Sequence, residues 1–323
     1  MSKINWEEIV SEFDKLNILV IGDAMIDSYI WGDIERNSPE APIPIVNATK
    51  YEKKLGGAAN VALNIKSLGA NPTLISVIGN NDNGFLDLMK KFDLSVEGIL
   101  QEDRLTTTKT RVISNNKHQL RIDEENTNDI ISENKLINLV FNSLAKTDVV
   151  LFQDYNKGVL TKRVIREIID KCNELNIPTL VDPKLKNYWE YKNVSLFKPN
   201  LKELNNSSES EILSSDLKSI SLEVKKQRLE LNAKELIVTL SDKGVFFQND
   251  NLEFHLPVYI QDIIDVSGAG DCVIAILALI YNSNLNKQEV VSLANLCGGL
   301  ACKKVGVASL EKAEVTEQAI RLI

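Results

Sequence analysis

Short apolar runs recur along the sequence, and segments with helical periodicity separate most of them. The runs are 18–21, 73–79, 148–152, 178–181, 194–197 and 236–240. Strands that alternate with helices are typical of a parallel sheet covered by helices on both faces. Polar residues follow several of these runs directly, and ligands bind at the carboxyl ends of the strands in such sheets. The pattern therefore predicts an α/β protein with a polar site along one edge of its sheet.

Two stretches interrupt this alternation. Residues 29–54 contain three prolines within six positions, which exclude a helix or a central strand but suit edge strands or an extended flap. Residues 106–124 alternate in a strand-like way on both sides of Asn115-Asn116, which predicts a hairpin. No linker, repeat or low-complexity tract divides the chain. We therefore expect one domain over residues 1–323 with both stretches inserted as a lid, and the apolar faces of the lid strands suggest a homodimer.

The overall composition limits the classes of function. A net charge of −8 argues against broad binding of nucleic acid or anionic membranes, although a phosphorylated substrate needs only a few local cations. No apolar segment approaches the ~18–20 residues that span a bilayer, and the N-terminus lacks the apolar core of a signal peptide. We therefore expect a cytoplasmic enzyme. The four cysteines form no C-x-x-C pair and are expected as buried thiols, and two histidines are too few for a histidine-rich metal site.

The most informative stretch is Asp-Val-Ser-Gly-Ala-Gly-Asp at 265–271, followed at once by the apolar run 272–280. Gly268 and Gly270 allow a tight turn, and the run after Asp271 has the length of a helix. The free N–H groups at a helix N-terminus form an anion site. Asp271 would lie at its mouth as a base beside a phosphate that is being transferred. The alternative is a capping Asp that stabilises the helix by roughly 0.5–2 kcal/mol.

Other candidate positions give weaker signals. Gly56-Gly57 opens a second helix, from whose first turn Asn60 projects. Asp23 and Asp27 follow the first strand, where polar side chains can reach a substrate; for Asp23 a structural role in a turn is equally compatible with the sequence. Three basic residues of the predicted hairpin are further candidates, and for two of them an exposed surface charge is the favoured interpretation. They are Lys109, Arg111 and Arg121.

The common nucleotide-binding motifs are missing. The sequence has no G-x-x-x-x-G-K-[ST] loop and no G-x-G-x-x-G after the first strand. A nucleoside triphosphate would therefore be held at the glycine turn before Asp271. We expect the adenosine side to be lined by residues 239–244 and Asn295. Asn200 and Glu203 are candidates to hold Mg²⁺ through water, since that ion keeps several of its water ligands.

Together these motifs resemble those of the ribokinase-like (phosphofructokinase-B) sugar kinases, along essentially the whole chain. Gly56-Gly57-Ala58-Ala59-Asn60 is similar to the N-terminal signature of the family, residues 265–271 to its C-terminal one, and Asn200-Leu201-Lys202-Glu203 to its N-x-x-E magnesium motif. The resemblance implies a three-layer α/β sandwich with a mostly parallel central sheet, flanking helices and a small β-strand lid. It also implies ATP and Mg²⁺ as cofactors.

Within this family the chain looks most like the kinases of D-glycero-β-D-manno-heptose 7-phosphate in ADP-heptose synthesis, which serves lipopolysaccharide core synthesis. The marks are found at 22–27, 38–44, 56–62, 154–158, 182–184 and 198–200. Bifunctional members carry a second, nucleotidyltransferase domain, and since this chain ends at residue 323 the expectation is kinase activity alone. Two positions depart from the family pattern. Ser267 stands where Thr is usual and keeps the hydroxyl, whereas Cys272 stands where Thr is common and removes it.

The resemblance assigns roles to individual residues. Asp271 would take the proton of the anomeric hydroxyl while the amides of Gly268, Ala269 and Gly270 stabilise the phosphoryl group. The sugar phosphate would be bound by Asp27, Gly56, Gly57, Asn60, Arg111, Asp154, Lys157 and Lys184. The nucleotide would be bound by Asn200, Leu201, Lys202, Glu203, Thr239, Ser241, Lys243, Gly244, Asp265 and Asn295. Lys157, Lys184 and Arg111 are the candidates for the phosphate of the substrate.

Two alternatives remain open on the sequence. The first is a related kinase of another sugar, sugar phosphate or nucleoside. The second is a catalytically silent binding or regulatory protein on the same fold. A panel of sugars under saturating ATP and Mg²⁺ would separate these hypotheses.

Overall fold

The computed structural model describes residues 4–323 except 116, 261, 305, 307 and 308, and it is organised around a nine-stranded sheet. The order of the strands is β13-β12-β11-β10-β9-β8-β1-β4-β5. The strands are β1 (Asn17–Gly22), β4 (Asn71–Asn81), β5 (Ile99–Leu105), β8 (Val149–Gln153), β9 (Thr179–Asp182), β10 (Leu196–Phe197), β11 (Glu235–Thr239), β12 (Val245–Gln248) and β13 (Glu253–Leu256). Neighbouring strands from β11 to β5 are parallel, and β12 and β13 add an antiparallel hairpin at one edge.

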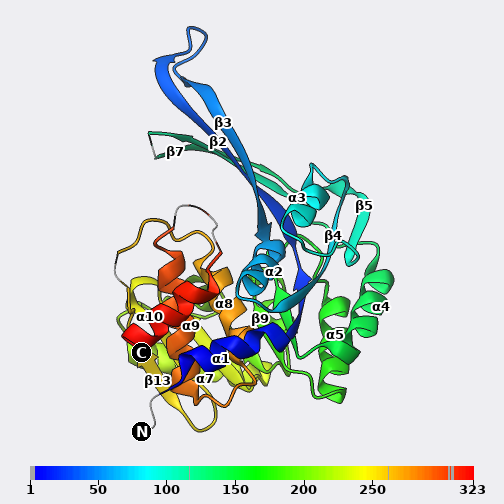
Figure 1. The fold of residues 1–323 in the computed structure, drawn as a ribbon, viewed down its shortest axis with the longest axis vertical. Coiled ribbons are helices and arrows are strands. Elements are labelled where there is room, and N and C mark those ends of the chain that lie inside the picture. The colour runs from blue at the N-terminus through cyan, green and yellow to red at the C-terminus, as the bar shows by residue number, and fades with distance from the viewer. Residues whose placement is uncertain (1–3, 116, 261, 305, 307–308) are drawn as a thin grey trace.

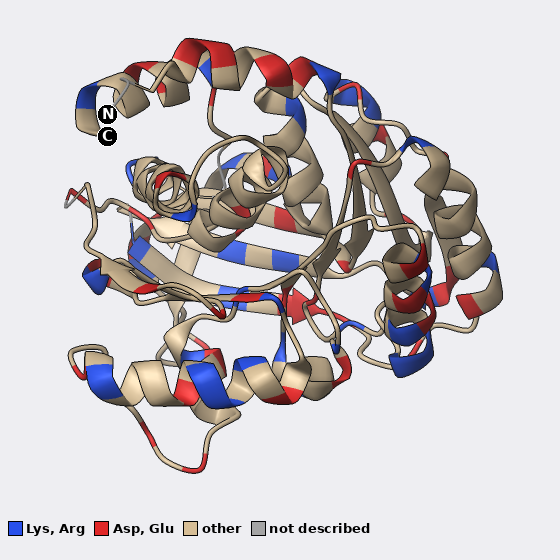
Figure 2. Cartoon of the chain, turned by 90° about the horizontal axis from the view of Figure 1, so that it is seen from below, with Lys and Arg blue, Asp and Glu red and all other residues tan. Residues whose placement is uncertain are grey.

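Helices cover both faces of this sheet (Figure 1). One layer contains α1 (Trp6–Ser11), α2 (Ala58–Ser67), α3 (Phe85–Lys91), α8 (Ala269–Ile280), α9 (Lys287–Ala301) and α10 (Lys312–Leu322). The other contains α4 (Glu133–Ser143), α5 (Lys162–Glu174), α6 (Leu201–Asn206) and α7 (Leu217–Leu231). Figure 2 shows helices on both sides of the strands, with charged residues of both signs along the outer ones.

The strand β1 shows why the sheet is buried on both faces. Ile18 and Val20 pack into the core cluster that includes α8 and α9, whereas Leu19 and Ile21 pack into the cluster that includes α4 and α5. Side chains of a strand point alternately to opposite faces, so an uninterrupted apolar run supplies both cores. The predicted three-layer α/β fold is confirmed.

A separate four-stranded sheet, which we call the lid, projects from the main body (Figure 1). Its order is β3-β2-β6-β7, formed by β2 (Ala24–Asn37), β3 (Pro44–Gly57), β6 (Thr108–Ser114) and β7 (Lys117–Glu124). The strands β2 and β6 are parallel, and the other two pairs are antiparallel. The lid therefore includes both stretches that interrupt the βα alternation, and β2 and β3 extend beyond the predicted bounds of 29–54. Residue 116 of the predicted hairpin turn lies outside the described residues.

One strand of the main sheet has no counterpart among the predicted apolar runs. In β5, exposed residues alternate with less exposed residues, and this pattern fits its position at the edge of the sheet beside β4. No helix among the described residues is long and apolar enough to cross a membrane.

Candidate active site

The N-terminus of α8 forms the turn that the glycine motif predicts. Gly268 is the N-cap residue with φ of 79°, a left-handed conformation that residues with a Cβ rarely adopt. The first intrahelical bond runs from Cys272 N to Gly268 O at 3.0 Å. Ala269 N bonds the carbonyl of Val266 at 3.3 Å, so the amides of Gly270 and Asp271 are the first-turn donors that such a helix start offers to an anion.

Asp271 follows this turn and its carboxylate accepts three hydrogen bonds from side chains. Asn60 Nδ2 donates to Oδ2 at 2.6 Å, while Tyr155 Oη and Gln153 Nε2 donate to Oδ1 at 2.8 and 3.1 Å. Burial raises the pKa of Asp271 to about 6, although the hydrogen bond from Asn60 opposes this shift. The nearby charge of Asp182 contributes to this raised pKa. A carboxylate with such a pKa is ionised at neutral pH yet basic enough to accept a proton.

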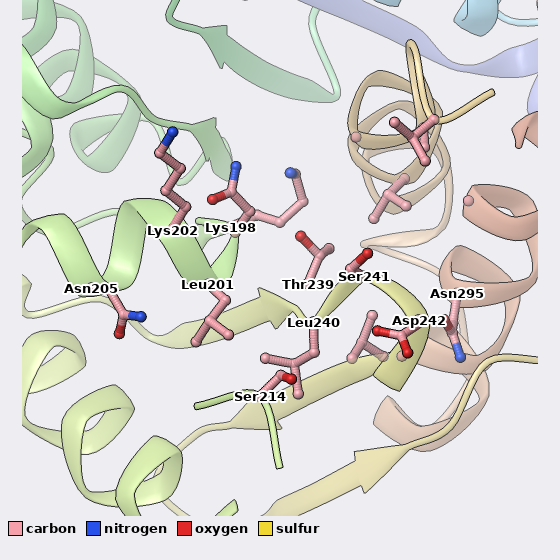
Figure 3. Close-up of a pocket in the computed structure, with 18 of the residues that line it drawn as sticks. Lys198, Leu201, Lys202, Asn205, Ser214, Thr239, Leu240, Ser241, Asp242 and Asn295 are labelled. Carbon is pink, nitrogen blue, oxygen red and sulfur yellow. The ribbon is translucent and has the colours of Figure 1, made fainter. Parts of the chain in front are cut away.

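Asp271 lines a cavity of about 1130 Å³, a volume that accommodates a nucleotide together with part of a second substrate. Most residues expected around the phosphates and the nucleotide lie in its wall. They are Gly268, Ala269, Gly270, Lys184, Asn200, Leu201, Lys202, Thr239, Ser241, Gly244 and Asn295. Figure 3 shows Lys202 on the α6 side, Asn295 on the helix at the right, and Thr239 and Ser241 between them.

The N-x-x-E motif forms the capping box of α6. Asn200 Oδ1 accepts from Glu203 N at 2.9 Å, and Glu203 Oε2 accepts from Asn200 N at 2.9 Å. Glu203 Oε1 is paired with Lys184, which also lies over the ring of Tyr155. Burial opposes the charge of Lys184, but Asp182 and Glu203 raise its pKa above the usual value.

This motif fits a magnesium site only in its water-mediated form. Amide and carboxylate oxygens are suitable donors, but both carboxylate oxygens of Glu203 already accept a bond from the protein. Asn200 lies in the wall of the cavity, and no cluster of three or more His, Cys, Asp or Glu able to hold a metal occurs among the described residues. Asn200 and Glu203 therefore suit an ion held mainly by water and by the nucleotide.

Five of the eight residues expected to hold the sugar phosphate lie together at the base of the lid. Asp27 Oδ1 is paired with Arg111 Nη1, and a Cβ on Gly56 would lie 2.3 Å from Asp27 Oδ2. Gly57 has φ of 57° and faces the carbonyl of Asp23, which a Cβ would approach to 2.3 Å. Asn60 connects this group to the cavity through its bond to Asp271. The lid thus begins directly beside the carboxylate of α8.

The other candidate residues lie outside this cavity. Lys157 is paired with Glu125 at 2.8 Å. Asp265 stabilises the turn before α8, since its carboxylate accepts from Ser267 N and Gly306 N at 2.9 and 2.8 Å. Lys243 is half-exposed and is paired with Asp242.

Two aspartates near the sheet edge have their carboxylates directed into the protein. Asp23 accepts from the amides of Tyr155, Lys157 and Val159 at 2.8 to 3.1 Å, and it thereby fixes the loop 154–159. Asp154 accepts from Tyr191 Oη at 2.7 Å, and burial together with the charge of Asp23 raises its pKa to about 7. Both carboxylates therefore have structural partners. Asp154 belongs to the loop 154–159, and its carboxylate is bonded to Tyr191 and does not line the cavity.

Four residues of the site received no role from the sequence. Gln153 and Tyr155 follow β8 and bind Asp271 directly. Asp182 ends β9, and Lys198 follows β10; their side chains form an ion pair at 3.2 Å. Tyr155, Asp182 and Lys198 lie in stretches that carry the family resemblance, at 154–158, 182–184 and 198–200. Each of the four also follows or ends an apolar strand, but that position is shared by many polar residues at the same end of the sheet.

Comparison with known proteins shows the family of this chain. The family model of the pfkB family carbohydrate kinases matches residues 15–313. Bifunctional protein HldE of Campylobacter curvus is 38% identical over 307 residues, which are 94% of this chain and 65% of the relative. Bifunctional protein HldE of Sulfurimonas denitrificans is also 38% identical, over 93% of this chain and 63% of the relative. The chain thus spans slightly less than two thirds of the length of these relatives.

Solved structures share the fold. Ribokinase from Thermotoga maritima has a TM-score of 0.70 at 22% identity, covering 95% of this chain and 99% of its own. Phosphofructokinase-2 from Escherichia coli in complex with substrates and products has a TM-score of 0.79 at 17% identity, with coverages of 95% and 99%. These structures share the α/β fold with this chain, and the family match shows an ATP-dependent phosphotransferase. The chain belongs to the pfkB family of carbohydrate kinases.

Proposed function

We propose that the protein transfers the γ-phosphoryl group of ATP to the anomeric hydroxyl of D-glycero-β-D-manno-heptose 7-phosphate. The product would be the 1,7-bisphosphate, an intermediate of ADP-heptose synthesis, made in the cytoplasm. The family supports the transfer of phosphate to a sugar, and similarity to bifunctional HldE proteins over most of the chain supports the choice of sugar. The observation that carries the chemistry is the buried Asp271 carboxylate at the N-terminus of α8, in the wall of a nucleotide-sized cavity.

In this proposal Asp271 is the general base. The anomeric hydroxyl gives its proton to Asp271 as its oxygen attacks the γ-phosphorus, and the bond to the β–γ bridging oxygen breaks with ADP as leaving group. General-base assistance is typically worth ~10²–10⁴-fold. Asn60, Tyr155 and Gln153 hold the carboxylate in one orientation, which supports this role because the base must meet the hydroxyl within hydrogen-bond distance.

The remaining binding roles follow the layout of the cavity. The turn at residues 268–270 would hold the transferred phosphate, and the lid base at Asp27, Gly57 and Asn60 would hold sugar hydroxyls. Mg²⁺, when bound through water at Asn200 and Glu203, would neutralise charge on the β- and γ-phosphates. The substrate phosphate would be bound by Arg111, Lys157 or Lys184, each of which is now paired with a carboxylate. The lid would exclude water and so protect ATP from hydrolysis.

A sugar panel tests the choice of substrate. With saturating ATP and Mg²⁺, ADP release should depend on the heptose 7-phosphate and be at least about tenfold lower with hexose phosphates, pentoses or nucleosides. Faster turnover with another sugar would favour the second candidate, a related kinase of different specificity. Loss of the heptose 7-phosphate signal in Asp271→Asn links the turnover to this site.

We also infer a homodimer formed through the lid. Leu120 and Ile122 alternate along β7, and the strand pairing places Leu120 beside Val112, Ile30 and Tyr51 on one face of the sheet. Leu120, Ile122 and Tyr51 are 57%, 47% and 73% exposed. Such an apolar face suits contact with the same face of a second copy.

The oligomeric state in solution tests this inference. Leu120→Asp should convert the dimer to a monomer in sedimentation velocity. The matched change Leu222→Asp, at an exposed leucine of α7, should leave the dimer intact. A wild-type monomer at micromolar concentration would contradict the dimer.

A further inference from the structure

A buried lysine lies beside the phosphate-binding turn without an assigned task. The side chain of Lys198 is 3% exposed, yet the residue lies in the wall of the cavity that Asp271 lines. It follows β10 directly, so a short, fully buried strand holds its backbone in place. In Figure 3 its amino group extends toward the interior of the cavity, next to Thr239. Burying an ammonium group costs several kcal/mol unless partners compensate for the lost water.

The position of Lys198 relative to α8 is more specific than its burial. A Cβ built on Gly270 would lie 3.8 Å from Lys198 Nζ and 3.9 Å from Asp182 Oδ2. The space directly in front of the second residue of α8 is therefore bounded by an ammonium group and a carboxylate. The N-terminus of a helix carries partial positive charge, so an ammonium group placed there is disfavoured unless an anion lies between the two.

The protein supplies only part of the negative charge that this ammonium group needs. Asp182 Oδ1 lies 3.2 Å from Lys198 Nζ. Asp182 also accepts from Gln153 Nε2 at 3.2 Å, and the same amide nitrogen donates to Asp271 Oδ1 at 3.1 Å. Gln153 thus couples the ion pair to the carboxylate of α8, and the three side chains keep a fixed spacing.

We propose that Lys198 is a further catalytic residue, whose ammonium group binds the γ-phosphoryl oxygens opposite the amides of Gly270 and Asp271, and that Asp182 positions it. This proposal rests on the phosphoryl transfer proposed above but not on the identity of the sugar. The lysine takes no part in the proton transfer: the hydroxyl proton goes to Asp271, and the bridging electron pair leaves with ADP. The lysine contributes by stabilising charge on the three transferred oxygens.

The alternative is that Lys198 only balances the charge of Asp182 and Asp271. The two roles differ in pH dependence. The charge of Lys198 lowers the pKa of Asp271, so a lysine that acts only through Asp271 would, when removed, shift the acid limb of kcat to higher pH. Activity would then return at pH 9. If the lysine binds the transferred group, its removal lowers kcat at every pH.

The first experiment measures nucleotide binding without any sugar. Isothermal titration with Mg²⁺ compares ADP with AMP-PNP, which carries a γ-phosphoryl group that is not transferred. Lys198→Met should weaken binding of AMP-PNP at least about tenfold, the order expected for one charge-assisted bond, and leave ADP binding within about threefold. Equal losses for both nucleotides, or none, would overturn the proposal.

The second experiment measures kcat from pH 6 to pH 9 with the sugar that the wild-type protein accepts. Lys198→Met should lose ~10²-fold at pH 9, as for removal of one donor to a developing oxyanion. Recovery to within threefold at pH 9 contradicts a contact with the phosphoryl group. If no sugar is accepted by the wild type, the proposed substrate has failed, while the titration still decides on Lys198.

A matched control separates this role from the loss of an ion pair. Lys287 Nζ pairs with the buried Glu235 at 2.7 Å. Glu235 begins β11, so this ion pair lies at the amino end of the strand, whereas the site lies at the carboxyl ends. Lys287→Met should lower the melting temperature without changing kcat or the preference for AMP-PNP over ADP. Should Lys198→Met not fold, Lys198→Arg decides instead. It should lose at least tenfold in kcat at pH 9 with ADP binding unchanged, and wild-type activity in that variant overturns the proposal.

Discussion

The hydrogen bond from Tyr155 to Asp271 can be tested by a substitution that removes only the hydroxyl group beside the proposed base. Tyr155 Oη donates to Asp271 Oδ1 at 2.8 Å, and Tyr155→Phe deletes only this hydroxyl. A hydrogen bond to a charged group is worth ~1.5–3 kcal/mol, and one pKa unit corresponds to ~1.4 kcal/mol. The bond favours the ionised carboxylate, so its loss should raise the pKa of Asp271 from about 6 by roughly one to two units.

The assay is kcat/KM against pH from 5 to 9. A general base works only when it is ionised, so the acid limb should move upward by the same one to two units. Activity at pH 9 should stay within about threefold of the wild type. Tyr191→Phe is the matched control, because it deletes the bond from Tyr191 to the buried Asp154 at 2.7 Å and should leave the limb in place. An unmoved limb in Tyr155→Phe, or equal loss at every pH, would refute the reasoning.

Three further predictions concern stability and metal. The pKa of Asp154 is about 7 in the folded protein and ~3.9 in the unfolded chain, so the folded state binds this proton more tightly and the free energy of unfolding falls as the pH rises between those values. Asp154→Asn lacks this proton, so its free energy of unfolding in urea should increase relative to the wild type by up to ~1.4 kcal/mol per pH unit over that range. A difference between the two proteins that does not change with pH contradicts this. Gly57→Ala should cost ~1–3 kcal/mol in the same assay because φ is 57° and the Cβ meets the carbonyl of Asp23 at 2.3 Å, whereas Gly84→Ala, with a positive φ but open space, should cost less. Removing Mg²⁺ with EDTA should abolish ADP release, with unchanged circular dichroism, and full activity without divalent ions would contradict the assignment of Asn200 and Glu203.

The sequence was sufficient for the architecture because burial of strands leaves a strong local pattern. The apolar run at 18–21 supplies both cores, and the glycine turn before Asp271 is a local conformation that the residues themselves require. The interruption by the lid was visible for the same reason, since the prolines and the Asn115-Asn116 pair are local signals in the sequence. Strand β5 was missed because it lies at the edge of the sheet, where alternating charges resemble a loop.

The partners of Asp271 could not be predicted in the same way. Asn60, Gln153 and Tyr155 converge from α2 and from the end of β8, and no local pattern encodes that convergence. For Asp23 the sequence left a ligand contact and a structural role equally open, and the structure shows the structural role, because three backbone amides donate to its carboxylate. Position in a sheet predicts which edge a side chain occupies, whereas its partner depends on distant segments.

The measurement that tests the account most directly is the turnover of Asp271→Asn with ATP, Mg²⁺ and the heptose 7-phosphate. The amide is nearly isosteric with the carboxylate but cannot accept the proton of the hydroxyl. The account predicts a loss of ~10²–10⁴-fold in kcat at every pH, with wild-type affinity for ADP and a native circular dichroism spectrum. A folded Asp271→Asn protein with kcat within threefold of the wild type would contradict it.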